Sequence, residues 1–240
     1  STIDDIGFTS ALIDSIAAEY SINQDRVYST GMSNGGFMSY QLACELSDRI
    51  AAIASVTGSM NLGWFNSCNP NHPTPVMEIH GTLDPTVPYT ASGFTESISD
   101  IMDFWANFNN CNSTPIVTNV PNINTIDGCT AEHQIWENGS NGVVVEHYKI
   151  IDGEHTWPGA PITVGVTNYD IDASEKIWEF FNKYDINGLI TATSTSNITT
   201  EKSPQLIKII DVLGRETIPK ANTLLFYIYE DGTVEQKMSI

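Results

Sequence analysis

The sequence predicts an α/β fold with a mainly parallel sheet, followed by a small β-rich tail. Up to residue 186, segments whose apolar residues repeat at helical spacing alternate with short apolar runs, which is typical of a parallel sheet covered by helices. Beyond residue 204, three short β-prone runs follow one another without a helical period. The charge changes at the same place: residues 1–190 hold five basic and 23 acidic residues, whereas residues 191–240 hold five and six.

The first elements alternate between helix and strand. Residues 5–20 carry apolar residues at helical spacing along one face and predict a helix. The β-rich run 27–30 predicts a short strand, and a helix is expected over 37–46, after the sequence GMSNGG. The apolar run 50–58 ends in glycine and predicts a buried strand.

The same alternation continues along the chain. Residues 59–74 contain Gly, Asn and Pro and predict a loop, and 75–81 predict a strand that glycine closes. A helix is expected over 94–110, where three aromatic side chains share one face. Residues 111–142 are rich in Asn, Gly and Thr and predict loops and a hairpin, and 142–151 predict a further strand.

The last predicted helix of this part spans 172–184, with Asp172 or Ser174 able to cap its N-terminus. After it, the Thr- and Ser-rich composition is typical of a linker. We therefore predict three parts: a catalytic domain over 1–186, a linker over 187–204 and a β-rich tail over 205–240.

Composition and motifs exclude several classes of function. The net charge of −19 disfavours nucleic acid and anionic lipid as partners, because phosphate binding needs a basic face. The longest apolar runs are far shorter than the roughly 18 residues of a membrane-spanning helix. The sequence holds no phosphate-binding glycine motif and no histidine pair with metal-ligand spacing, so we expect neither nucleotide binding nor a zinc hydrolase.

Four cysteines are present, and none of them forms a C-x-x-C pair. Of the three possible pairings, we favour the sequential one, Cys44–Cys68 and Cys111–Cys129, because it closes two short loops. The alternative is four buried free thiols in a reducing compartment.

Residues Gly31 to Gly35 form a G-x-S-x-G motif between a predicted strand and a predicted helix. In this context Ser33 is expected in a strained strand-to-helix turn, which projects its hydroxyl from the end of the sheet. The glycines remove side chains that would clash in such a turn. The backbone N–H of Asn34 would then point at a developing oxyanion.

A serine nucleophile needs a base, and the base needs a carboxylate to orient it. Asp84 follows the predicted strand over 75–81, and His155 lies on a loop between the last predicted strand and helix. Together with Ser33 they have the order Ser, Asp, His. Glu154 is a rival carboxylate, but neighbouring loop residues usually face apart, so we expect it to be solvated.

Other residues near these loops have supporting or structural interpretations. His80 is expected to brace the Asp84 turn by hydrogen bonding. Trp64, Tyr89 and Trp157 are candidates for lining an acyl or aryl pocket, although each of them is equally well explained as a core or loop anchor.

Four segments carry a family resemblance: residues 4–8, 26–44, 79–89 and 153–159. In this order they resemble the secreted polyhydroxybutyrate depolymerase/feruloyl esterase family of α/β-hydrolases. The resemblance implies ester hydrolysis without a cofactor, with Ser33 as nucleophile, Asp84 as acid and His155 as base. It also implies an extracellular location and disulfides in the loops that hold these cysteines.

The tail has a resemblance of its own. Residues 207–216 and 222–240 look like the C-terminal sorting domain of the type IX secretion system. This implies secretion machinery as a partner and export to the cell surface or beyond. The alternative is a small β module that binds carbohydrate or a protein partner.

The sequence departs from the family at its start. Family members have strands before the helix expected here over 5–20, and a His-Gly-rich loop among those strands supplies a second oxyanion N–H. We therefore expect a hydrolase fold without its N-terminal strands, in which Asn34 supplies half of the oxyanion hole. One missing donor costs roughly 10²–10³ in rate.

The sequence as a whole predicts a secreted serine carboxylesterase. The expected substrates are feruloyl or acetyl esters on plant polysaccharide, or hydroxyalkanoate polyesters. Two alternatives stay open: a non-catalytic surface binding protein on a degenerate hydrolase fold, and a peptidase that uses the same three side chains. The missing oxyanion loop favours the binding protein, whereas the intact order of Ser, Asp and His opposes it.

Overall fold

The computed structural model describes residues 3–162, 164–190, 205–211, 214–219, 223–229 and 234–239. The chain divides into two compact units, Ser1–Thr191 and Ala192–Ile240. Most of the predicted linker, residues 191–204, lies outside the described residues. Its first residues instead belong to a hairpin of the first unit, because β8 (Gly188–Leu189) pairs antiparallel with β7 (Tyr184–Asp185).

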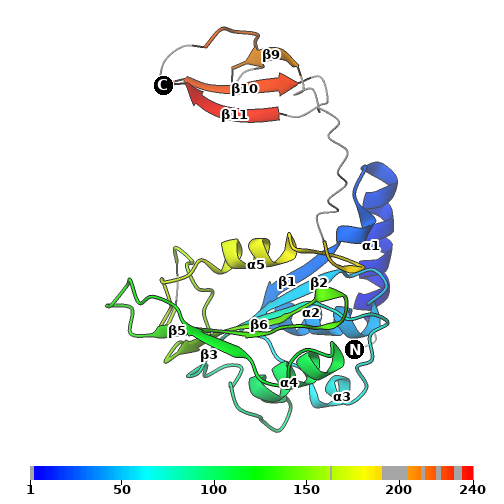
Figure 1. The fold of residues 1–240 in the computed structure, drawn as a ribbon, viewed down its shortest axis with the longest axis vertical. Coiled ribbons are helices and arrows are strands. Elements are labelled where there is room, and N and C mark those ends of the chain that lie inside the picture. The colour runs from blue at the N-terminus through cyan, green and yellow to red at the C-terminus, as the bar shows by residue number, and fades with distance from the viewer. Residues whose placement is uncertain are drawn as a thin grey trace. The chain divides into compact units, whose positions relative to one another are not determined.

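The first unit is built around a six-stranded sheet with the strand order β1-β2-β3-β6-β5-β4 (Figure 1). The four strands β1, β2, β3 and β6 run parallel to one another, β5 runs antiparallel to β6, and β4 runs antiparallel to β5. The strands are β1 (Tyr28–Met32), β2 (Ala52–Val56), β3 (Val76–Gly81), β4 (Ile116–Asn119), β5 (Thr130–Trp136) and β6 (Val145–Ile151). The predicted mainly parallel sheet is confirmed, and so is the predicted hairpin, which is formed by β4 and β5.

Helices cover both faces of this sheet (Figure 1). Helices α2 and α4 pack on one face and α5 on the other. The helical segments are α1 (Asp5–Glu19), η1 (Gln24–Arg26), α2 (Asn34–Glu45), α3 (Leu62–Phe65), α4 (Ile98–Phe108), η2 (Ser140–Gly142) and α5 (Ala173–Phe181). The short α3 lies in the segment that the sequence predicted as loop.

The core consists of two layers, one on each side of the sheet. In β2, Ile53 packs into the α2 and α4 layer, whereas its neighbours Ala52 and Ala54 pack into the α5 layer. Every residue of β2 and β3 is buried. Because both sheet faces are covered, buried residues follow one another along these central strands instead of alternating with exposed ones.

The helix caps follow the sequence closely. Asp4 caps α1 by accepting from the backbone N–H of Gly7 at 2.7 Å. Asp172 caps α5 by accepting from the backbone N–H groups of Ser174 and Glu175. Of the two caps considered for this helix, Asp172 is the correct one, and it leaves Ser174 inside the first turn.

One of the two predicted disulfides is present. Cys44 of α2 and Cys68 are bonded, with their Cα atoms 4.9 Å apart. The predicted Cys111–Cys129 bond is wrong, because both thiols are free in the part of the chain that the structure describes. Cys111 packs against the α2 and α4 layer, whereas Cys129 is buried in the α5 layer. The sheet therefore lies between them, which proximity in sequence does not reveal.

The second unit is a three-stranded antiparallel sheet with the order β11-β10-β9. Its strands are β9 (Leu206–Ile210), β10 (Thr223–Tyr229) and β11 (Val234–Ser239). The central strand β10 contributes the buried side chain of Leu225. The three strands predicted in the tail are confirmed.

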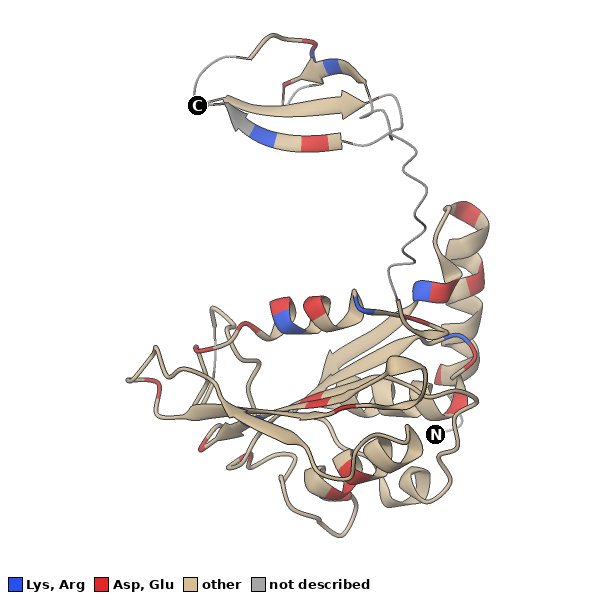
Figure 2. Cartoon of the chain, in the orientation of Figure 1, with Lys and Arg blue, Asp and Glu red and all other residues tan. Residues whose placement is uncertain are grey.

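Acidic side chains outnumber basic ones over the helices and loops of the first unit (Figure 2). Among the described residues, no helix is long and apolar enough to cross a membrane. The same residues contain no group of three or more His, Cys, Asp or Glu side chains arranged to hold a metal ion.

Candidate active site

Ser33 lies in a sharp turn between β1 and α2. Its backbone angles, φ 55° and ψ −117°, are strained for a residue with a side chain. The backbone N–H of Ser33 donates to the carbonyl of Val56 at 2.9 Å, which holds the turn in place. Within the described residues, the Ser33 hydroxyl makes no capping hydrogen bond to α2. It is therefore not engaged by the helix that it precedes.

Close backbone approaches explain the glycines around this turn. A Cβ added to Gly31 would lie 2.7 Å from the Cα of Gly35, so a side chain does not fit there. A Cβ added to Gly36 would lie 2.9 Å from the Cα of Gly58, which follows β2. The helix α2 begins at Asn34, three residues earlier than predicted, because these glycines let its first turn pack directly against the sheet.

The first turn of α2 provides a place for negative charge. The first N–H groups of a helix have no acceptor within that helix, and the helix dipole adds partial positive charge there. Asn34 is the first residue of α2 and follows Ser33 directly. Its N–H is therefore one of the first N–H groups of α2 and lies beside Ser33, the predicted nucleophile.

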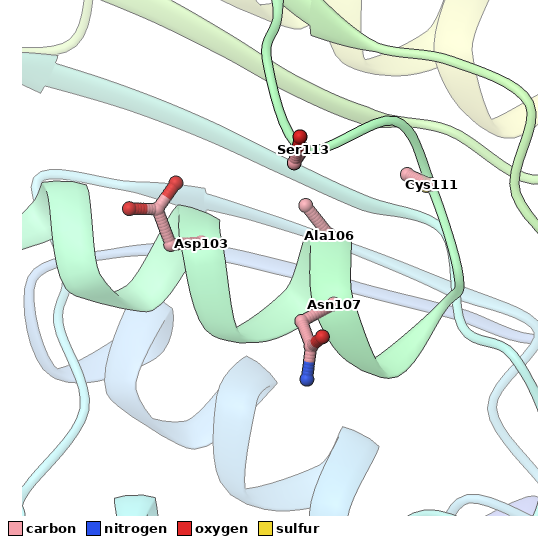
Figure 3. Close-up of a pocket in the computed structure, with 5 residues that line it drawn as sticks. All are labelled: Asp103, Ala106, Asn107, Cys111 and Ser113. Carbon is pink, nitrogen blue, oxygen red and sulfur yellow. The ribbon is translucent and has the colours of Figure 1, made fainter.

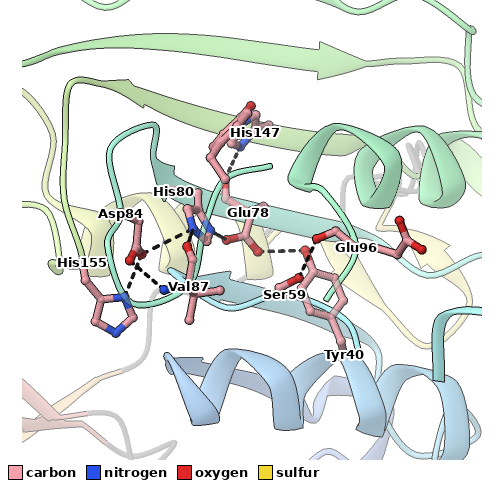
Figure 4. A network of polar contacts seen from close by, with 10 residues as sticks. Tyr40, Ser59, Glu78, His80, Asp84, Val87, Glu96, His147 and His155 are labelled. Carbon is pink, nitrogen blue, oxygen red and sulfur yellow. Dashed lines mark hydrogen bonds and ion pairs between the residues drawn. The ribbon is translucent and has the colours of Figure 1, made fainter. Parts of the chain in front are cut away.

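Asp84 lies in the turn after β3, and hydrogen bonds engage both of its carboxylate oxygens. Oδ1 accepts from the backbone N–H groups of Thr86 and Val87, each at 2.8 Å. Oδ2 accepts from Nδ1 of His155 at 2.7 Å (Figure 4). Burial alone would raise the pKa of Asp84, but hydrogen bonds from His80, His155 and the two N–H groups outweigh it and lower the pKa.

His155 lies on the loop after β6, and its side chain is 17% exposed, against 0% for Asp84. Because Nδ1 faces a carboxylate, we assign the ring hydrogen of the neutral form to Nδ1. Nε2 is then free to accept a proton, as a general base must. The loop is held close to β3: a Cβ on Gly81 would lie 2.3 Å from the carbonyl oxygen of Gly153.

The three predicted residues follow three parallel strands at the same edge of the sheet. Ser33 follows β1, Asp84 follows β3 and His155 follows β6. A hollow of about 230 Å³ is lined by His155 and Trp157 together with Met32, the residue before Ser33. Among the described contacts, no hydrogen bond joins the Ser33 hydroxyl to the His155 ring. In enzymes without substrate, such hydrogen bonds are often long and tighten only in the complex.

The remaining sequence candidates have different surroundings. Trp157 lines the hollow beside His155. Tyr89 packs against the core, and its hydroxyl is 2.9 Å from Nε2 of His147. Trp64 is half-buried in α3, and neither it nor Tyr89 is among the described residues that line the hollow. Glu154 is not merely solvated, because its carboxylate accepts from the backbone N–H of Val166 at 3.1 Å.

His80 braces the Asp84 turn, as predicted. Its Nε2 is 2.9 Å from the carbonyl of Val87 and 3.4 Å from Oδ2 of Asp84. Sequence reasoning missed the residue on its other side, Glu78, which is fully buried in β3 (Figure 4). The available signal was the position of this carboxylate between the apolar residues Met77 and Ile79 of the predicted strand, where burial needs a partner.

A separate hollow of about 300 Å³ lies between α4 and the segment that follows it (Figure 3). It is lined by Asp103, Ala106, Asn107, Cys111 and Ser113. None of these described residues belongs to the site around Ser33 and His155.

Comparison with known proteins identifies the fold of the first unit. The solved structure of an acetyl xylan esterase from Aspergillus awamori matches with a TM-score of 0.51 and 15% identity, over 74% of this chain and 66% of that chain. Residues 4–113 match the family model described as phospholipase/carboxylesterase. The first unit therefore has an α/β-hydrolase fold.

Curated relatives are esterases by name. The chain is 26% identical over 197 residues to the bifunctional acetylxylan esterase/xylanase XynS20E of Neocallimastix patriciarum, covering 82% of this chain and 26% of the relative. It is 29% identical over 164 residues to feruloyl esterase B of Piromyces equi, covering 63% and 29%. It is 26% identical over 210 residues to the putative esterase NocK of Nocardia uniformis subsp. tsuyamanensis, covering 73% and 56%. The chain thus spans between about a quarter and a little over half of these relatives.

Proposed function

We propose that the protein is a serine carboxylic ester hydrolase in which Ser33 is the nucleophile, His155 the base and Asp84 the orienting acid. The observation that carries this proposal is the 2.7 Å hydrogen bond between Asp84 and Nδ1 of His155. Ser33 lies at the same edge of the sheet in a strained backbone conformation, and its hydroxyl does not cap α2. The esterase names of the relatives support the same reaction class.

The proposed reaction has two halves. Nε2 of His155 takes the proton of the Ser33 hydroxyl as the oxygen attacks the ester carbonyl, and Asp84 stabilises the resulting imidazolium. The tetrahedral oxyanion accepts a hydrogen bond from the N–H of Asn34. His155 then returns the proton to the leaving alcohol, which leaves an acyl group on Ser33. Water, activated by the same imidazole, releases the acid.

The substrate classes follow from the relatives and from the hollow. Feruloyl and acetyl esters on plant polysaccharide are the first choice, because relatives are named for these chemistries. Hydroxyalkanoate polyesters are the second. Trp157, Ile162 and Val164 line the hollow beside His155 and offer an apolar surface to an acyl or aryl group. Trp64 and Tyr89 stay candidates for substrate contacts in the complex.

Export is part of the proposal. The Cys44–Cys68 disulfide is typical of proteins from an oxidising compartment. The second unit, with its three antiparallel strands, resembles a type IX sorting domain in its sequence. We therefore propose secretion or cell-surface display, with residues 205–240 as the sorting domain and the secretion machinery as its partner.

The test of activity is turnover of p-nitrophenyl acetate by the full chain and by two serine variants. Ser33→Ala is expected to lower kcat by at least about 10³, because the nucleophile is lost. Ser15→Ala is the matched control, because this hydroxyl bonds only to the Ala11 carbonyl of its own helix among the described contacts. Full turnover by Ser33→Ala contradicts the proposal.

A panel of feruloyl, acetyl and 3-hydroxybutyryl esters then ranks the substrate classes. If the folded full chain hydrolyses none of these esters, the alternative of a non-catalytic binding protein is favoured. Clear turnover of matched amides as well as of esters would favour a peptidase instead.

A further inference from the structure

A second buried acid–histidine pair lies directly behind Asp84 (Figure 4). Glu78 and His80 are two residues apart on β3, so both side chains point to the α2 and α4 side of the sheet. Both are 0% exposed. Nδ1 of His80 is 3.0 Å from Oε1 of Glu78, and its Nε2 is 3.4 Å from Oδ2 of Asp84. Glu78, His80, Asp84 and His155 thus form one continuous chain of contacts.

The partners of the His80 ring determine where its hydrogens lie. The Val87 carbonyl can only accept, so Nε2 must carry a hydrogen to bond it at 2.9 Å. Nδ1 faces the carboxylate of Glu78, so a hydrogen is favoured there as well. Burial alone would lower the pKa of His80, but the hydrogen bonds to Asp84 and Glu78 outweigh it and raise the pKa to about 9. The ring is therefore an imidazolium at neutral pH.

Groups from other elements face this pair. From α2, the Tyr40 hydroxyl donates to Oε2 of Glu78 at 2.8 Å. Burial raises the pKa of Glu78, and hydrogen bonds from His80 and Tyr40 partly offset this. His80 retains the proton that the pair shares, because two carboxylates face its ring.

The strand β6 contributes a second, neutral imidazole. Nδ1 of His147 donates to the backbone carbonyl of Glu78 at 3.0 Å, and its Nε2 accepts from the Tyr89 hydroxyl. Burial lowers the pKa of His147 to about 3, so it carries no charge at neutral pH. Lys149 of β6 lies over the Tyr89 ring, 5.8 Å from its centroid, and Tyr89 in turn meets the His80 ring edge-on.

We propose that Glu78 and His80 are positioning residues that direct the Asp84 carboxylate at Nδ1 of His155 and balance part of its negative charge. This inference rests on the proposed function, because it concerns the base of that reaction. The positive charge of His80 partly compensates the negative charge of Asp84. Without it, the negative charge of Asp84 acts uncompensated on the neighbouring imidazolium, which it stabilises more strongly. The base is then blocked over part of the working pH range.

The test combines two measurements on the full chain. Ring-nitrogen NMR at pH 7.5 is expected to show His80 doubly protonated in the wild type and singly protonated in Glu78→Gln. The pH profile of kcat/KM for p-nitrophenyl acetate, normalised by active-site titration, is then recorded. The acidic limb is expected to move up by about one pH unit in His80→Gln. Glu78→Gln is expected to move it in the same direction, because it removes the charge on His80.

His72→Gln is the matched control. Its ring bonds the backbone carbonyls of Pro73 and Ser47 and precedes β3 at the end of the strand away from Asp84. This variant is expected to leave the acidic limb in place. If His80 only braces the fold, His80→Gln should contain fewer active molecules, but the acidic limb of its pH profile should stay at the wild-type position.

The outcomes separate this inference from the proposed function. A singly protonated His80 in the wild type at pH 7.5, or an unmoved limb in the folded variants, overturns the inference. If the wild type shows no turnover, the proposed function fails. In that case the ring-nitrogen NMR comparison of His80 between the wild type and Glu78→Gln carries the test. If His80→Gln does not fold, Glu78→Gln gives the same comparison.

Discussion

Replacing Gly81 by alanine tests whether the close packing of two loops holds the site together. The added Cβ would lie 2.3 Å from the Gly153 carbonyl oxygen and 2.7 Å from the Glu154 carbonyl oxygen. Ordinary contacts of carbon atoms are about 3.5 Å, so the loop that carries His155 must move away by about 1 Å. Such overpacking costs roughly 1–3 kcal/mol of unfolding free energy.

The same displacement should weaken catalysis more than it weakens the fold. The Asp84–His155 hydrogen bond joins the two segments that are pushed apart. A misplacement of about 1 Å costs about 10²-fold in rate, so kcat/KM should fall by about that factor. Urea unfolding and p-nitrophenyl acetate hydrolysis measure the two effects on one preparation.

Gly93→Ala is the control for a glycine substitution as such. Within the described residues, a Cβ at Gly93 would meet nothing within 4 Å. This variant should keep wild-type activity and gain a few tenths of a kcal/mol, since alanine restricts the unfolded chain. Wild-type stability together with wild-type activity in Gly81→Ala would refute the packing argument.

Two further predictions concern stability. The Cys44–Cys68 bond joins residues 24 apart in sequence and restricts the unfolded chain. Replacing both cysteines by alanine should therefore lower the free energy of unfolding in urea by about 3 kcal/mol. A loss below about 1 kcal/mol would show that the disulfide does not stabilise the fold in this way. The two buried histidines contribute to the pH dependence of stability on opposite sides of pH 6.5, where an unfolded imidazole titrates. Burial lowers the pKa of His147 to about 3. Below pH 6.5 the unfolded chain therefore binds more protons at this residue than the folded chain, so the free energy of unfolding falls as pH falls. Burial alone would lower the pKa of His80, but hydrogen bonds to Asp84 and Glu78 raise it to about 9, so stability also falls as pH rises from 6.5 to 9. Each slope should be roughly 1 kcal/mol per pH unit, and equal urea midpoints at pH 6.5 and 8.5 would be inconsistent with a charged His80.

The elements that the sequence predicted best are those in which local pattern and burial agree. The run at β2 is apolar because both faces of this central strand are covered, and its length allows only a strand there. The G-x-S-x-G motif located the strained turn because Gly31 and Gly35 meet in space as well as in sequence. Asp172 marked the start of α5 because its side chain completes the first turn.

The sequence could not show on which side of the sheet a residue lies. Cys111 and Cys129 are close along the chain, but one packs in the α2 and α4 layer and the other in the α5 layer. The same limit hid Glu78, because a carboxylate in a strand normally faces solvent. Its burial makes sense only with the partners that α2 and β3 itself supply, Tyr40 and His80.

The central claim is that Ser33 is a nucleophile activated by His155. Incubating the full chain with a fluorophosphonate and mapping the adduct by peptide mass spectrometry tests this claim without choosing a substrate. We predict a single adduct on Ser33 in the wild type, with labelling at least about 10²-fold slower in His155→Ala because the base is gone. An adduct on another residue, or no labelling of the folded wild-type chain, would contradict the account.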